Sequence, residues 1–374
     1  MKVMKLHLKG GEPLSYDISI GYDVRGGIGR SVRELDIARR YVIITDANVA
    51  AIYGGRLLEE LQEAGLNVDL IEFPAGEASK NIHTALSVVR QLLKLGVDRK
   101  SALIAFGGGV VGDLTGFVAS LYMRSLPYMQ IPTTLVAQVD SSIGGKTAID
   151  LEEGKNLLGT FYQPRAVMTD PVFLETLPEE EFGNGLAEIV KYGIIAQGTF
   201  FKLLEEEMEA VKKRERNVLA KIIETSCGIK KGLVEIDEKD QGPRRFLNFG
   251  HTLGHALEAA SGYALSHGKG VSLGMMAAAR LSEKICGFPS VQRERVEKLI
   301  LNAGLPTTIP GEISTDLTIS KLTMDKKKAG KTINFVLLKK IGEPIVTGDV
   351  NETMLKETME RLKDDGTTAS GIAG

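Results

Sequence analysis

Residues 101–116 read SALIAFGGGVVGDLTG, an apolar run that leads into a cluster of glycines. Residues 102–106 are typical of a buried strand, and Gly107, Gly109 and Gly112 match the pattern G-x-G-x-x-G at the start of a helix. Glycines at such a turn let the backbone approach a diphosphate, to which the helix N-terminus offers free N–H groups. The pattern alone is a weak signal, because a tight strand-to-helix turn without a ligand needs similar glycines.

The segments around this turn alternate between apolar runs and helical patterns. Residues 41–45, 68–73 and 128–131 are further strand-like runs, and apolar residues at helical spacing occur between them, for example over 85–92. This alternation predicts a Rossmann-like α/β fold with a mostly parallel sheet covered by helices. Residues 3–24 follow a different pattern, for which we expect antiparallel edge strands.

The pattern changes after Pro178. From there to about Leu301, apolar residues recur at helical spacing with few β-branched runs. We therefore expect an α/β domain at 1–178, a mainly α-helical domain at 179–364 and a disordered polar tail at 365–374.

The overall composition limits the class of protein. A chain of 374 residues is long enough for two domains at roughly 150 residues each. Its net charge of −2 argues against nucleic-acid and anionic membrane partners. We expect neither a signal peptide nor a membrane span, because the first ten residues lack a continuous apolar run and no stretch of about 18 apolar residues occurs. Cys227 and Cys286 cannot form a disulfide framework. These features predict a cytoplasmic enzyme, although composition alone does not exclude a structural protein.

Three of the five histidines, His251, His255 and His267, lie within one short region. The first two are four residues apart in FGHTLGHALE, so a helix places them on one face. Upstream, Glu188 and Lys191 share a helix face in GLAEIVKYG. Histidines combined with a carboxylate are typical of catalytic zinc sites, although capped core histidines without a metal would show the same spacing. The spacing also leaves open whether His255 binds a metal or transfers a proton.

Further polar residues are candidates for anion binding. Lys146 and Lys155 lie beside glycines in QVDSSIGGKTAIDLEEGKN, at 138–156. A lysine is a compact cation suited to phosphate or carboxylate, and the alternative is a pair of surface lysines on a long loop. Arg245 and Asn248 lie just before the histidine region and are candidates for anion and hydroxyl binding, although a single arginine is more often a surface ion-pair partner.

One feature departs from the usual dinucleotide fingerprint. An acidic residue about 20 positions after the glycines is expected to bind the ribose, but the next apolar run, SLPYMQIPTT, contains none. Asp46, at the end of an earlier apolar run, and Glu77 in PAGEASK are the candidates for this role.

Eight segments, in this order, resemble the 3-dehydroquinate synthase family. They are PAGEASK, GGGVVGDLTGFVAS, PTTLVAQVDSSIGGKT, GKNLLGTFYQP, AEIVKYG, FLNFGHTLGHALE, HGKGVSLGM and MDKK, and they span roughly residues 75–328. The family has an N-terminal NAD-binding α/β domain and a C-terminal helical domain. Many members read GGKTG-x-N where this chain reads GGKTAID, so Ala148 and Asp150 differ beside Lys146 without replacing it.

The resemblance implies a set of site residues. A zinc or cobalt ion would lie on Glu188, His251 and His267, with His255 on the substrate side. NAD contacts would come from Asp46, Glu77, Lys80, Gly108, Gly109, Val110, Val111, Gly112, Asp113, Thr133, Thr134, Lys146, Lys155, Phe173, Leu174, Glu175 and Thr176. Substrate contacts would come from Asp140, Lys146, Asn156, Lys191, Arg245, Asn248 and His255. In a homodimer, Arg124 would reach the phosphate of the partner subunit's substrate, and Lys326 or Lys327 would join the substrate site.

The activity implied by the resemblance is the conversion of 3-deoxy-D-arabino-heptulosonate 7-phosphate to 3-dehydroquinate and phosphate, in the shikimate pathway. It combines NAD-dependent oxidation, phosphate elimination, reduction, ring opening and an intramolecular aldol closure. The alternatives are another sugar phosphate cyclase and a metal-dependent polyol or glycerol phosphate dehydrogenase, which would make net NADH. A non-catalytic metal-binding protein would leave the glycine turn and the lysines unexplained.

Overall fold

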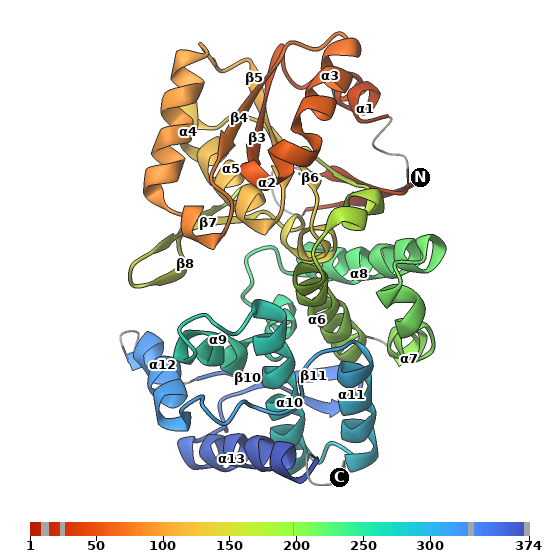
Figure 1. Cartoon of the computed structure of the whole chain (residues 1–374), viewed down its shortest axis with the longest axis vertical. Helices are drawn as coiled ribbons and strands as arrows, with labels where there is room; N and C mark the ends of the chain where they lie inside the picture. Colours follow the sequence, from red (N-terminus) through yellow and green to blue (C-terminus); the bar gives the residue numbers. More distant parts are fainter. Residues whose placement is uncertain (9–14, 23–26, 197, 328–332, 370–374) are drawn as a thin grey trace. The chain divides into compact units, whose positions relative to one another are not determined.

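The chain folds into two compact units. The computed structural model describes residues 1–8, 15–22, 27–196, 198–327 and 333–369. Unit 1 comprises Met1–Pro178 and Leu219–Lys239, and unit 2 comprises Glu179–Val218 and Asp240–Gly374 (Figure 1). Among the described residues, no helix combines the length and the apolar character needed to cross a membrane.

Unit 1 is built on a seven-stranded sheet with the order β1-β2-β9-β6-β5-β3-β4. The strands are β1 (Lys2–Leu6), β2 (Tyr16–Ile20), β3 (Arg40–Asp46), β4 (Val68–Phe73), β5 (Ser101–Gly107), β6 (Tyr128–Pro132) and β9 (Ala166–Thr169). All neighbouring pairs are parallel except β1 with β2, which lies at one edge. The expected parallel sheet with an antiparallel edge is therefore confirmed.

Helices cover both faces of this sheet. They are α1 (Ile28–Leu35), α3 (Gly55–Glu63), α4 (Ile82–Lys94) and α5 (Gly109–Leu121). Successive side chains of a strand point to opposite faces. Val42 and Ile44 of β3 pack with α4 and α5, whereas Tyr41 and Ile43 pack with α1 and α3 (Figure 1). Burial on both faces explains why β3 and β5 are continuous apolar runs.

The strand order reverses between β3 and β5. From β3 the chain proceeds to β4 at one edge, then returns to β5 and continues through β6 and β9 in the other direction. Thr45 lies opposite Phe106 in the β3–β5 register, so Asp46 ends its strand beside the glycine turn. The carboxyl ends of strands at such a reversal form the usual ligand crevice of an open α/β sheet.

Smaller elements complete unit 1. They are α2 (Ala47–Val49), the π-helical turns η2 (Ala50–Gly54) and η5 (Ala137–Ser141), the 3₁₀ turns η3 (Glu77–Ser79), η4 (Tyr122–Arg124) and η6 (Pro171–Thr176), and the strands β7 (Lys146–Leu151) and β8 (Gly154–Phe161). β7 and β8 pair as an antiparallel hairpin. The sequence suggested a long loop here, but Thr147 and Ile149 alternate inward and anchor the hairpin.

Helix α8 (Arg216–Ile236) belongs to unit 1 from Leu219 onward, although the sequence analysis assigns 179–364 to the second domain. The thiol of its buried Cys227 donates to the carbonyl oxygen of Gln138 at 3.2 Å. Helical spacing reveals the apolar face of such a segment, but it does not reveal which core that face joins.

Unit 2 is mainly helical, as expected. Its elements are α6 (Glu179–Ile195), α7 (Gly198–Lys212), the 3₁₀ turn η7 (Pro243–Asn248), α9 (His251–Ala260), α10 (His267–Cys286), α11 (Ser290–Asn302), α12 (Thr315–Lys327), α13 (Glu352–Ala369) and the hairpin β10 (Phe335–Lys340) with β11 (Glu343–Thr347). Helix α13 extends into the segment predicted to be a disordered tail, and residues 370–374 lie outside the described residues.

Glycines bring helices α9 and α10 into direct backbone contact. A β-carbon at Gly274 would lie 1.8 Å from the carbonyl oxygen of Gly250, and one at Gly254 would lie 2.8 Å from that of Gly270. A larger residue at these positions would force the two helices apart. Because α9 begins at His251 and α10 begins at His267, this close packing also brings two histidines together.

Gly274→Ala is therefore expected to destabilise unit 2 by about 3 kcal/mol and to lower the thermal unfolding midpoint followed by circular dichroism. Gly232→Ala is the matched control, because no described atom lies within 4 Å of its β-carbon position inside α8. That control should gain up to about 1 kcal/mol from better helix propensity. Equal midpoints for the wild type and Gly274→Ala would contradict the backbone contact.

Candidate active site

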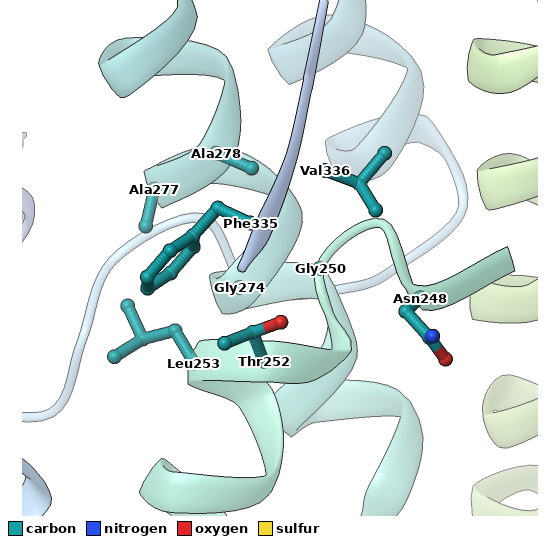
Figure 2. Close-up of a pocket in the computed structure, with 9 residues that line it drawn as sticks. All are labelled: Asn248, Gly250, Thr252, Leu253, Gly274, Ala277, Ala278, Phe335 and Val336. Atoms are coloured by element: carbon teal, nitrogen blue, oxygen red, sulfur yellow. The ribbon is translucent and has the colours of Figure 1, made fainter. Parts of the chain in front are cut away.

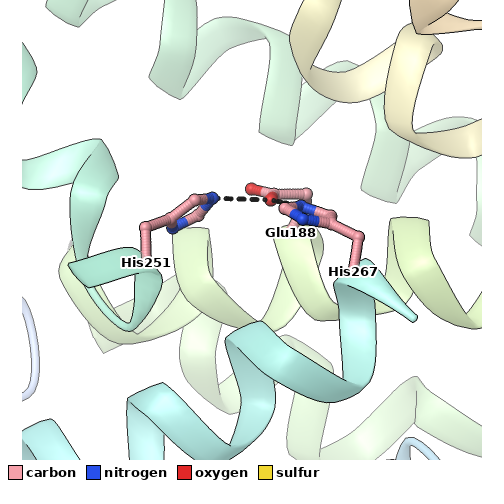
Figure 3. A group of neighbouring side chains, drawn as sticks. All are labelled: Glu188, His251 and His267. Atoms are coloured by element: carbon pink, nitrogen blue, oxygen red, sulfur yellow. Dashed lines mark hydrogen bonds and ion pairs between the residues drawn. The ribbon is translucent and has the colours of Figure 1, made fainter. Parts of the chain in front are cut away.

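Three side chains from three helices of unit 2 converge on one point (Figure 3). Oε1 of Glu188 on α6 lies 3.2 Å from Nε2 of His251 on α9 and 3.0 Å from Nε2 of His267 on α10. In a tetrahedral zinc site with bonds of about 2.0–2.1 Å, neighbouring ligand atoms lie about 3.3 Å apart. Both distances to Glu188 are close to this value, and the ligand atoms of all three residues lie within 4.8 Å of one another, so the group could hold one zinc-like ion.

The other ring nitrogen of each histidine lies near a hydrogen-bond acceptor. Nδ1 of His251 is 3.2 Å from the carbonyl oxygen of Phe249, and Nδ1 of His267 is 3.3 Å from Oε1 of Glu258. These acceptors favour a proton on Nδ1 of each ring, so Nε2 is the nitrogen that can give up its proton and bind a metal ion. The residues present thus fit a metal ion in both spacing and tautomer.

Glu188 carries a buried charge. Its side chain is 1% exposed and forms an ion pair with Lys191, which is equally buried. Burial disfavours the carboxylate, but Lys191 and the two histidines outweigh burial and hold the pKa of Glu188 well below its usual value. Glu188 is therefore ionised at neutral pH, as a metal ligand must be.

His267 is placed where a positive charge is favoured. Burial alone would lower the pKa of its imidazole, but hydrogen bonds to Glu188 and Glu258 raise this pKa to about 10. In the metal-free protein the ring therefore carries a proton between two carboxylates. A metal cation would replace that positive charge on the Glu188 side.

His255 lies beside this group of side chains. Its ring centroid is 5.2 Å from that of His251 and 6.0 Å from that of His267, and its side chain is exposed. With Glu258 and His267 it forms a second group of side chains with closely spaced potential ligand atoms. Its accessibility fits a substrate-side group better than a third histidine ligand of the Glu188 cluster.

The two adjacent arginines before the histidine region differ in burial. Arg245, singled out from the sequence, is exposed, whereas Arg244 is only 2% exposed. The sequence alone does not indicate which of two adjacent arginines points inward, because this depends on the conformation of the turn η7. Arg244 is therefore a candidate that sequence reasoning missed.

Asn248 lines a small cavity in unit 2 together with Gly250, Thr252 and Phe335 (Figure 2). Phe335 of β10 lies beside Leu253 of α9 and the alanines of α10 in this view. The cavity has a volume of about 10 Å³, which is room for one water molecule. It is too small for a substrate, so the cavity that Asn248 lines is not a preformed substrate pocket.

The glycine turn of unit 1 leaves a helix N-terminus open. Helix α5 begins directly after β5, and no side chain among the described residues caps its free N–H groups at Gly108. Close packing explains the glycines, since a β-carbon at Gly107 would meet Val111 at 2.5 Å and one at Gly108 would meet Thr134 at 2.8 Å. The open N-terminus at the reversal of strand order fits a diphosphate.

The predicted cofactor residues follow the carboxyl ends of the parallel strands. Asp46 ends β3, Glu77 and Lys80 follow β4, Gly108–Asp113 follow β5, Thr133 and Thr134 follow β6, and Phe173–Thr176 follow β9. Tyr53 links two of these positions, because its ring packs edge-on against Phe173 and its hydroxyl lies 2.8 Å from Oγ1 of Thr176. The side chain of Val111 is fully buried, so only its backbone is available to a cofactor.

Lys80 joins three of the predicted residues. Its ammonium is 2.6 Å from Oδ2 of Asp113 and donates to Oδ1 of Asn156 at 2.5 Å. Burial would lower the pKa of Lys80, but Asp113 outweighs burial and raises it. The contact ties the β7–β8 hairpin to α5 and to the strand ends.

The other polar candidates of unit 1 are distributed around this hairpin. Lys146 is exposed on β7, and Lys155 on β8 makes a long ion pair of 3.8 Å with Glu77. Asp140 pairs with Lys230 of α8, whose ammonium also donates to the Asp140 carbonyl oxygen at 2.6 Å. Lys230 was missed because it lies in a lysine-rich helical segment that is typical of a solvated surface.

Arg124 occupies a strained turn. Met123, Arg124 and Ser125 have φ angles of 52°, 66° and 89°, which is left-handed backbone at three consecutive non-glycine residues. Such backbone costs roughly 1 kcal/mol or more per residue and is concentrated at functional segments. Arg124 is exposed at this turn. The side chains of Lys326 and Lys327 lie outside the described residues, although both positions belong to α12.

Family models match most of the chain. The model described as 3-dehydroquinate synthase N-terminal matches residues 70–184, and the one described as 3-dehydroquinate synthase C-terminal matches residues 185–328. A 3-dehydroquinate synthase from Desulforamulus reducens is 43% identical over 90% of this chain and 94% of the relative. One from Caulobacter vibrioides is 44% identical over 91% of this chain and 94% of the relative.

Solved structures share the fold. A 2-epi-5-epi-valiolone synthase from Streptomyces hygroscopicus, with NAD+ and Zn2+ bound, is 27% identical with a TM-score of 0.87, over 95% of this chain and 98% of that chain. A 2-deoxy-scyllo-inosose synthase complexed with carbaglucose-6-phosphate, NAD+ and Co2+ is 24% identical with a TM-score of 0.88, over 96% and 100% of the two chains. An iron-containing alcohol dehydrogenase is 15% identical with a TM-score of 0.66, over 93% and 97%, which shows a similar fold only.

His251→Ala and Glu188→Gln are each expected to reduce bound zinc from one ion per chain to a small fraction after dialysis, because each removes one of three protein ligands. Metal content by mass spectrometry measures this loss. His83→Ala is the control, since His83 is an exposed histidine on α4. Full zinc content in both cluster variants would contradict the ligand assignment.

Proposed function

The chain belongs to the 3-dehydroquinate synthase family, and on that premise we propose roles for its site residues in the family's reaction. Its activity is the conversion of 3-deoxy-D-arabino-heptulosonate 7-phosphate to 3-dehydroquinate and phosphate. It is a phosphate-eliminating cyclase of aromatic amino acid biosynthesis. Its cofactors are NAD and a zinc or cobalt ion.

The two cofactors supply the chemistry that side chains lack. When bound, NAD+ accepts a hydride from the C5 hydroxyl carbon and later returns it, so that no net NADH forms. When bound, the metal ion acts as a Lewis acid that makes the C5 hydroxyl more acidic. The protein residues therefore need to hold these groups, bind the phosphate and carboxylate, and manage protons.

We assign the metal to Glu188, His251 and His267. The observation that carries this proposal is the convergence of one ionised, buried carboxylate oxygen with two histidine Nε2 atoms at 3.2 and 3.0 Å. Three protein ligands leave a fourth position for a substrate oxygen, as in catalytic zinc sites. Lys191 forms an ion pair with Glu188, which places its amino group beside the proposed metal ligand.

We assign NAD to the carboxyl ends of the parallel strands in unit 1. The reversal of strand order between β3 and β5 and the open N-terminus of α5 support the diphosphate position. Asp46 ends the strand at this reversal, so it is the better placed of the two acids proposed for the ribose. Lys80, held by Asp113, fixes the neighbouring loop and the hairpin.

The substrate carries a carboxylate and a phosphate, and both units offer cations for them. In unit 1 we assign Lys146, Asn156 and the Asp140–Lys230 pair to the substrate. In unit 2 we assign Lys191, Asn248 and His255, and we prefer the inward-turned Arg244 to the exposed Arg245. The exposed His255 is the proposed proton-transfer group.

The direct test of the activity uses purified protein with the heptulosonate phosphate, catalytic NAD+ and zinc. Phosphate and dehydroquinate are expected in equal amounts, at turnover numbers well above the NAD+ supplied, and a chelator should abolish both. No release of phosphate by folded, zinc-loaded protein would contradict the function. Net accumulation of NADH would favour the dehydrogenase alternative, and turnover of a sugar phosphate without a carboxylate would favour another cyclase.

We further propose a cytoplasmic homodimer in which Arg124 contacts the substrate of the other subunit. The strained, exposed turn at 123–125 supports a role for Arg124 beyond folding. Free thiols at Cys227 and Cys286, both among the described residues, suit a reducing compartment.

Subunit complementation tests the role of Arg124. Arg124→Ala and His251→Ala homodimers are each expected to be nearly inactive. A mixed dimer, purified through two different tags, has one site with both residues if Arg124 acts across the interface, so it should recover about half of wild-type activity. Arg99→Ala, at an exposed arginine, is the control and should stay active. Inactive mixed dimers would show that Arg124 does not act on the partner's substrate.

A further inference from the structure

Glu258 is a buried carboxylate that the proposed function does not use. It lies on α9 with 4% of its side chain exposed, and its Oε1 is 3.3 Å from Nδ1 of His267. A β-carbon at Gly270 of α10 would lie 2.8 Å from Cγ and 3.1 Å from Oε1 of Glu258. The glycine therefore makes the space in which this carboxylate reaches the histidine.

The contact gives His267 a defined orientation. The Glu258 oxygen is placed to accept a hydrogen bond from Nδ1 of His267, so Nδ1 carries a proton and Nε2 is the nitrogen that can bind a metal ion. His267 needs this constraint, because its side chain is 32% exposed and it is the first residue of α10. By comparison, His251 is 14% exposed and has a backbone carbonyl as its Nδ1 acceptor.

The backbone of His267 is fixed from another side. Asn184 lies four residues before Glu188, on the same face of α6, and its Oδ1 accepts from the N–H of Gly268 at 2.7 Å. Asn184 therefore holds the first turn of α10, but it does not control rotation of the imidazole ring. Glu258 supplies the missing constraint on that rotation.

We propose that Glu258 is a positioning residue for the metal, which fixes the ring and the tautomer of His267 so that Nε2 binds the ion. This inference rests on the proposed metal site. The inference also concerns the second group of potential ligands, His255 with Glu258 and His267. If Nδ1 of His267 keeps its proton, this group is not a second metal site. One ion per chain follows.

The test measures metal binding and not turnover. Glu258→Ala should weaken zinc binding by about 10- to 100-fold in competition with a chromophoric chelator. It should also change the visible absorption spectrum of the cobalt-loaded protein, because His267 is no longer held. Glu258→Gln is of the same size and can still accept through its amide oxygen, so it should recover part of the affinity and of the spectrum.

Glu180→Gln is the matched control. It removes an exposed ion pair of 3.2 Å between Glu180 of α6 and Lys269 in the first turn of α10, and should leave zinc affinity unchanged. The unfolding midpoint of each metal-free variant reports purely structural effects. A structural role alone would lower that midpoint without changing zinc affinity or the cobalt spectrum.

Two results would overturn the inference. One is wild-type zinc affinity in Glu258→Ala, and the other is two ions per wild-type chain, with one lost in that variant. These results are distinct from failure of the proposed metal site itself, which would appear as no stoichiometric zinc in the wild type or as undiminished zinc in His251→Ala.

Discussion

Unit 2 depends on the charge of one buried carboxylate. Glu188 is almost inaccessible to solvent and ionised, which is costly unless other groups compensate the charge. Lys191 compensates it from the next turn of the same helix, and His251 and His267 approach from α9 and α10. Glycines lie at the contact between α9 and α10, and they allow these two histidine-bearing helices to approach closely. A packing feature and a chemical requirement thus coincide.

In unit 1, the proposed cofactor site depends on the geometry of the backbone. Parallel strands that reverse their order leave an opening at their carboxyl ends, and the residues proposed to bind NAD follow those ends in sequence. The Lys80–Asp113 pair, buried beside the opening, connects the hairpin that carries Lys146 and Lys155. NAD is proposed to bind unit 1 and the metal ion unit 2, so each unit is proposed to supply one of the two cofactors.

Local patterns in the sequence predicted the features that depend on nearby residues. The glycine turn, the alternation of strands and helices, and the four-residue spacing of His251 and His255 all follow from periodicity and turn chemistry. Features that depend on tertiary packing were missed. Lys230 and Arg244 resemble surface residues in sequence, and only the folds of α8 and η7 turn them inward. Glu258 follows His251 by seven residues, which is the same helix face, so that spacing was a usable signal for it.

The most direct measurement of the central claim is anomalous diffraction at the zinc absorption edge from crystals of the zinc-loaded protein. The account predicts one peak per chain, about 2.0–2.2 Å from Oε1 of Glu188 and from Nε2 of His251 and His267. A peak bound through His255, a second peak at Nδ1 of His267, or the lack of any peak at Glu188 would contradict it.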